Sequence, residues 1–240
     1  MRKVKKLLLK LIQFLYRNTA DRGDIGFDID DTPDPLFGLM SGTAVDRFLI
    51  EKAFETASSA YSFDHTDGIG IEVGDTRYLE TYFKSYQKTK LSFIEGQPVQ
   101  LNAELRASGD LTVPRCEITK YFDVVISTQV LVYVKDDLQA IKTFKEMMKP
   151  NALLIGSESL VAPLSIYDES RWGEHRRYSP RSLRALLERE FELIKFEVLG
   201  NAVSSAALVL GIPIESIDKD LISKTRWSHG TCMFYIAKPI

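Results

Sequence analysis

Residues 121–127, YFDVVIS, form an almost unbroken apolar run of strand length. Such a run is typical of a strand that is covered on both faces in a parallel sheet. Similar runs recur along the chain, at 68–73, 90–95, 151–157, 191–200 and 231–239. Segments with apolar residues at helical spacing separate most of them, at 43–57, 76–86, 135–150 and 181–191. This alternation predicts an α/β fold with a mostly parallel sheet and helices on both faces, while residues 97–120 are predicted to be mostly loop.

Composition and charge narrow the classes of partner. The chain has 240 residues and a net charge of −2, which suits one α/β domain with an appendage and does not favour nucleic acid as a partner. Cys116 and Cys232 are predicted to be free thiols in a reducing compartment, with a disulfide as the alternative. The three histidines, at 65, 175 and 229, are too scattered to predict a metal site.

The first 20 residues carry six basic side chains and no acidic ones. Their apolar residues fall on one broad face of a helix and most of the basic residues on the other, which predicts an amphipathic helix at 1–20 that binds an anionic membrane surface. A helix docked on its own domain or on a partner protein is the alternative. Residues 21–42 are predicted to be an acidic linker or loop, and 43–240 a single domain. A cytoplasmic location follows, with the inner face of the membrane as the surface that residues 1–20 would bind.

The turn after the strand at 68–73 is the expected ligand site, because parallel sheets bind ligands beyond the carboxyl ends of their strands. The fingerprint G-x-G-x-x-G is absent, which disfavours NAD. The stretch IEVGDTRY instead resembles motif I of class I S-adenosylmethionine-dependent methyltransferases, with Glu72 and Gly74 at the acidic and first glycine positions. Thr76 and Tyr78 replace the other two glycines of the usual motif.

Other segments extend the resemblance to residues 43–240. They are GDL at 109–111, the run from YFDVVIS through KPNALLIGS at 121–157, and RWGEHRRYSPRSLRALLEREFELIKFEVLGN at 171–201. The set is similar to a bacterial, type 11-like branch whose motif I is itself poor in glycine, with the form E-I-G-D-x-x-Y. Glu72, Gly74, Asp75 and Tyr78 match that form. The resemblance implies a Rossmann-like, seven-stranded sheet with an antiparallel last strand near its edge.

The resemblance also implies a set of residues that bind S-adenosylmethionine. Gly74 would let the backbone approach the ligand, Glu72 would hold a loop amide or reach the amino acid part, and Asp75 would cap a helix or bind the amino group. Glu95 matches the acid that binds the ribose hydroxyls, and Asp110 matches the acceptor for the adenine amino group. The remaining positions that border the cofactor are Tyr78, Leu111, Thr128 and Gln129.

The segment ESRWGEHRRY, at 169–178, follows the strand at 151–157 and is predicted to contact the acceptor. Glu174 and His175 are the candidate general bases, although a single loop histidine is often not catalytic. Trp172 and Tyr178 suit stacking on a ring, and Arg171 and Arg176 suit anionic groups.

Together these features predict an O-methyltransferase that acts on a small or glycan-type acceptor. A lipid-linked or phenolic acceptor is the enzymatic alternative. The non-enzymatic alternative is an inactive methyltransferase homologue that binds a partner, since the glycines expected at Thr76, Tyr78, Asn151 and Ala152 are missing. A homodimer is compatible with the sequence.

Overall fold

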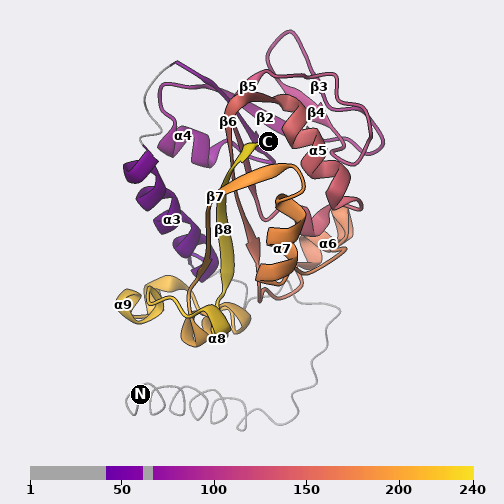
Figure 1. Ribbon diagram of the computed structural model, residues 1–240. Coiled ribbons are helices and arrows are strands. Elements are labelled where there is room, and N and C mark those ends of the chain that lie inside the picture. Colours follow the sequence, from indigo (N-terminus) through magenta and orange to yellow (C-terminus); the bar gives the residue numbers. More distant parts are fainter. Residues whose placement is uncertain (1–41, 62–66) are drawn as a thin grey trace.

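The computed structural model describes residues 42–61 and 67–240 (Figure 1). The predicted basic helix at 1–20 and almost all of the acidic linker at 21–42 lie outside the described residues. The rest of the predicted domain is an α/β structure in which one central sheet is flanked by helices.

The sheet has eight strands in the order β3-β4-β2-β1-β5-β6-β8-β7. All pairings among β4, β2, β1, β5 and β6 are parallel, and β8 is antiparallel to both of its neighbours. The predicted antiparallel last strand next to the edge is therefore confirmed. The strands are β1 (Ile69–Val73), β2 (Gln87–Phe93), β3 (Gln100–Leu101), β4 (Ala107–Gly109), β5 (Phe122–Thr128), β6 (Met148–Ser159), β7 (Phe191–Leu199) and β8 (Cys232–Pro239).

Helices cover both faces because the strand residues alternate between two buried clusters. Along β5, Val125 packs with one face, whereas Val124 and Ile126 pack with the other. The Val125 face is covered by α5 (Asp137–Met147) and α7 (Pro180–Leu187). The opposite face is covered by α3 (Val45–Tyr61), α4 (Arg77–Tyr82), α8 (Ala202–Val209) and α9 (Lys219–Ile222). The remaining elements are α6 (Ile166–Trp172), η1 (Leu131–Tyr133), η2 (Ile214–Ser216) and η3 (Trp227–His229).

Residues 97–120 were predicted to be mostly loop, and most of them do lie outside regular elements, but they also supply β3 and β4. β3 is a two-residue antiparallel strand at the edge, which gives the sheet one strand more than the seven expected. One local prediction differs from the structure. Pro150 was expected to end a helix, but α5 already ends at Met147 and Pro150 lies in β6. Its missing amide is tolerated there because the β5–β6 register shifts next to it, between the pairs Phe122–Met148 and Val124–Leu153.

The two thiols are free, as predicted: Cys232 is buried in β8 and Cys116 is half-buried. No helix in the described part of the chain is long and apolar enough to cross a membrane. Over the same residues, no group of three or more histidine, cysteine or acidic side chains is placed to hold a metal ion.

Candidate functional site

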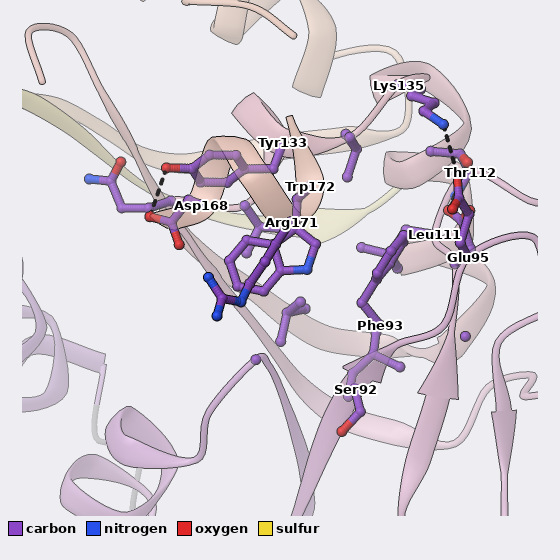
Figure 2. Close-up of a pocket in the computed structure, with 18 of the residues that line it drawn as sticks. Ser92, Phe93, Glu95, Leu111, Thr112, Tyr133, Lys135, Asp168, Arg171 and Trp172 are labelled. Carbon is purple, nitrogen blue, oxygen red and sulfur yellow. Dashed lines mark hydrogen bonds and ion pairs between the residues drawn. The ribbon is translucent and has the colours of Figure 1, made fainter. Parts of the chain in front are cut away.

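A cavity of about 510 Å³ opens beyond the carboxyl ends of β1, β2, β4 and β5 (Figure 2). Its volume lies within the range of small-molecule sites in proteins. Eight of the predicted site residues line it: Gly74, Glu95, Asp110, Leu111, Thr128, Gln129, Arg171 and Trp172. The parallel sheet brings them together, since residues that follow parallel strands meet at one edge.

The turn from β1 into α4 forms one wall through Gly74. This residue has φ +83°, a conformation that favours glycine, and no other atom lies near the position of an added Cβ. Its amide donates to the Leu91 carbonyl at 2.9 Å, which ties the turn to β2. The turn therefore presents bare backbone to the cavity.

Glu72 does not line the cavity, but its side chain holds this turn through backbone hydrogen bonds. Its buried carboxyl accepts hydrogen bonds from the amides of Tyr78 and Leu79, each at 3.0 Å, at the start of α4. Burial raises the pKa of Glu72 to about 7, although the two amides act in the opposite direction. Of the two roles predicted for Glu72, holding a loop amide is the one that this geometry gives it.

Asp75 and Tyr78 also lie away from the cavity lining. Asp75 is exposed, and its carboxyl accepts from the Thr76 amide at 2.7 Å. Tyr78 is buried and stacks on Phe54 with ring centroids 4.4 Å apart. The tyrosine of this motif is thus part of the core between α3 and α4.

Glu95 and Asp110 lie at the end of the cavity formed by β2 and β4. Lys135 reaches the Glu95 carboxylate at 2.9 Å. Asp110 accepts from Thr112 Oγ1 at 2.7 Å and from the amides of Thr112 and Gly96 at 2.9 and 3.1 Å. Burial opposes ionisation of Asp110, but these hydrogen bonds outweigh it and lower its pKa. Asp110 therefore carries a negative charge while it fixes the two loops around it.

The segment after β5 forms the next wall. Gln129 has φ +58°, and its amide donates to the Ser157 carbonyl at 2.7 Å. The following η1 is held by Glu158, whose Oε1 accepts from the Leu131 amide at 3.0 Å. Burial raises the pKa of Glu158 to about 8. The sequence analysis missed Glu158, because the predicted strand stopped at residue 157.

The opposite end of the cavity is formed by α6 together with η1. Asp168, Arg171 and Trp172 line the cavity from α6, and Tyr133 lines it from η1. The Tyr133 hydroxyl lies 3.4 Å from Asp168 Oδ2, and its ring meets Trp172 edge-on with centroids 6.0 Å apart. Tyr133 and Asp168 were not predicted. Asp168 precedes the predicted acceptor segment by one residue, and α6 itself was not recognised.

The second half of the predicted acceptor segment does not line the cavity. Glu174 pairs with Arg177, and the His175 side chain is exposed. Arg176 pairs with Asp137 at 2.6 Å, and the buried Tyr178 hydroxyl donates to the same carboxylate at 2.8 Å. These contacts fasten the segment to α5. The predicted role of Glu174 and His175 as general bases stays a prediction, whereas Asp168 and Tyr133 lie at the cavity itself.

The strand order and the position of the cavity define a Rossmann-like protein with a ligand site at the carboxyl edge of its sheet. No family model matches this chain, and no curated protein matches it.

Solved structures of similar fold include S-adenosylmethionine-dependent methyltransferases and the [4+2]-cyclase SpnF. One, a SAM-dependent methyltransferase from Thermotoga maritima, has 14% identity and a TM-score of 0.49 over 82% of this chain and 92% of its own. The N-methyltransferase NodS from Bradyrhizobium japonicum, solved with S-adenosylhomocysteine, has 13% identity and a TM-score of 0.48 over 95% and 97%. An S-adenosylmethionine-dependent methyltransferase from Mesorhizobium loti has 12% identity and a TM-score of 0.48 over 79% and 99%. At such identities the likeness concerns the fold alone.

Proposed function

We propose that this chain binds S-adenosylmethionine in the cavity and transfers its methyl group to an oxygen of a small or glycan-type acceptor. The observation that carries the proposal is the arrangement of the cavity wall. Bare backbone at Gly74 after β1, Glu95 after β2, Asp110 after β4 and Thr128 at the end of β5 all face one space.

These residues fit the parts of the cofactor. Glu95 would accept from the ribose hydroxyls, in exchange with its exposed pairing to Lys135. Leu111 and the half-exposed Phe93 offer apolar surface to a purine ring. Gly74 would let the amino acid part approach the backbone of the β1–α4 turn. The resemblance in sequence assigns Glu95, Leu111 and Gly74 to the same ligand.

When bound, S-adenosylmethionine supplies a methyl group on a sulfonium that departs as a neutral thioether. The contribution of the chain is to align an acceptor with that methyl group and to exclude water. Trp172 and Tyr133 supply aromatic surface at the α6 end of the cavity, which suits the face of a sugar ring or a phenol. A glycan is proposed ahead of a lipid-linked or phenolic acceptor because the charged side chains of Asp168 and Arg171 line the cavity beside these rings.

Calorimetric titration with S-adenosylhomocysteine tests the proposal. We expect a Kd in the micromolar range, which corresponds to about −7 to −8 kcal/mol. Absence of binding to the folded protein at millimolar ligand would refute the cofactor assignment and leave a partner-binding homologue as the remaining reading. Binding without methyl transfer to sugars, lipid-linked sugars or phenols would favour an inactive homologue.

A further inference from the structure

Three carboxyl side chains line the cavity, and two of them are already engaged. Glu95 pairs with Lys135, and Asp110 accepts three hydrogen bonds from Gly96 and Thr112. Asp168 is different: among the described residues, its carboxyl oxygens have one contact, the long hydrogen bond from Tyr133. The Asp168 carboxyl oxygens therefore have lone pairs left to accept further hydrogen bonds.

The local structure of α6 holds Asp168 toward the cavity. Ser165 caps the helix by accepting from the Asp168 amide at 3.2 Å, and Gly173 ends it with φ +72°. Asp168, Arg171 and Trp172 stand at i, i+3 and i+4, which places them on one face of a helix. Figure 2 shows this face turned to the cavity, with Asp168 beside Tyr133.

The two ends of the cavity differ in what they can recognise. Glu95 and Thr112 lie at one end and Asp168 and Trp172 at the other (Figure 2). If the nucleoside occupies the Glu95 end, as proposed above, the sulfonium points toward α6. The inference rests on that proposed function.

We propose that Asp168 faces the transferable methyl group and acts as the general base of the transfer. The acceptor oxygen forms a bond to the methyl carbon as the carbon–sulfur bond breaks, and its electron pair passes to sulfur. The acceptor proton moves to the Asp168 carboxylate. No further reactant is needed, since the positive charge of the sulfonium is neutralised as the proton is released.

Tyr133 is a positioning residue in this scheme. Burial, together with the neighbouring Asp168 and Glu174, raises the pKa of Tyr133 above its usual range, against the opposing effect of Arg177. The phenol therefore keeps its proton and donates it in a hydrogen bond to Asp168. It fixes the carboxylate without competing for the acceptor proton.

Charge discrimination between cofactor analogues tests this inference without knowledge of the acceptor. Sinefungin carries an amine where S-adenosylmethionine carries its methyl sulfonium, whereas S-adenosylhomocysteine is neutral there. The wild-type chain should bind sinefungin more tightly than S-adenosylhomocysteine. Asp168→Asn should weaken sinefungin binding by about 5- to 30-fold, the size expected for a charge-assisted hydrogen bond. The same change should alter S-adenosylhomocysteine binding by less than about twofold.

Two further variants sharpen the comparison. Glu169→Gln removes a charge from the next residue of α6, which does not line the cavity, and should leave both affinities unchanged. Asp168→Glu keeps the charge and should retain part of the preference for sinefungin over S-adenosylhomocysteine. If Asp168→Asn does not fold, carbodiimide labelling of the wild-type chain replaces it: sinefungin should protect Asp168 more than S-adenosylhomocysteine does.

The outcomes separate this inference from the proposed function. Equal losses for both ligands in Asp168→Asn, or no loss for either, would overturn the role of Asp168 while cofactor binding stands. Equal protection of Asp168 by the two ligands would do the same. Failure of the wild-type chain to bind either ligand would overturn the cofactor assignment, and the inference with it.

Discussion

At the scale of single residues, two buried glutamates hold the walls of the cavity by accepting backbone amides. Glu72 binds the first turn of α4, and Glu158 binds the first residue of η1. Amide hydrogen bonds favour the ionised carboxylate, whereas burial disfavours it, and burial prevails at both sites. Each side chain therefore holds its proton to a higher pH in the folded chain than in the unfolded chain.

This imbalance predicts a pH dependence of stability. Between the unfolded pKa near 4.5 and the folded pKa of about 8, the folded chain binds more protons at Glu158 than the unfolded chain does. The free energy of unfolding should therefore be greatest below pH 4.5 as far as Glu158 is concerned, and fall as the pH rises to 8. Tyr178 and Tyr235 interact electrostatically with Glu158, and burial is the main cause that raises their pKa values above the usual range. Both tyrosines therefore remain neutral in this pH range.

Glu158→Gln should remove this contribution. The slope of unfolding free energy against pH should become flatter by up to about 1.4 kcal/mol per pH unit. Urea unfolding at pH 5, 6, 7 and 8 measures it. Glu104→Gln, at an exposed turn, is the control and should follow the wild type. Identical slopes for wild type and Glu158→Gln would contradict the assignment.

Asp110 gives a second prediction at this scale. Asp110→Ala should weaken S-adenosylhomocysteine binding by about 1–3 kcal/mol, because the amides of Gly96 and Thr112 lose their acceptor beside the ligand. Titration of Asp110→Ala and of the exposed control Glu104→Ala measures the effect. An unchanged affinity in Asp110→Ala would place the nucleoside elsewhere.

At the scale of the elements, helix caps join segments that are far apart in sequence. Asn201 follows β7 and caps α8, with its Oδ1 accepting from the amides of Val203 and Ser204. Its Nδ2 donates to the carbonyls of Leu221, Ile222 and Lys224. One side chain thus satisfies both the start of α8 and the end of α9.

Asn201→Ala should therefore cost more than the loss of an ordinary cap. We expect a decrease of about 2–4 kcal/mol in unfolding free energy, because the substitution removes the cap of α8 and also leaves the carbonyls of residues 221, 222 and 224 without their donor. Ser179→Ala, which removes the exposed cap of α7, should cost about 1 kcal/mol. Denaturant unfolding compares them, and equal losses would mean that the contacts to residues 221–224 contribute little.

Elements with strong periodicity were predicted from the sequence, whereas those made by tertiary contacts were not. The strand at 121–127 and the helix at 43–57 have long apolar patterns and correspond to β5 and α3. Helix α6 has seven residues and depends on its cap at Ser165 and on Gly173, so it has no apolar period to detect.

The motifs of the site show the same division. Gly74 and Asp110 were located by matching short motifs, and both line the cavity. Asp123 and Lys149 belong to matched motifs too, but they lie near the starts of β5 and β6, at the edge of the sheet away from the cavity. There they form an ion pair at 2.8 Å. Tyr133 and Asp168 lie 35 residues apart and meet only because η1 and α6 follow neighbouring strands.

At the scale of the whole molecule, the predicted basic helix adds a test that is independent of the cavity. We propose that residues 1–20 bind anionic bilayers, since six basic side chains are each worth about 1 kcal/mol near such a surface. A chain that starts near Asp24 should fold and lose binding to phosphatidylserine liposomes. Binding of the full chain should weaken with salt. No binding at low salt would favour a helix docked on protein.

The position of β8 has a consequence for how the chain is made. β8 supplies the last described strand, yet it lies between β6 and β7 and pairs with both. During synthesis, β7 emerges from the ribosome before β8, its one neighbour among the described strands, which is formed from residues translated 33 or more positions later. Until then the unpaired backbone groups along the edges of β6 and β7 are open to a chaperone or to a second nascent chain. A released chain that ends at residue 231 should therefore keep the cavity strands β1, β2 and β5 resistant to protease while β7 is cut.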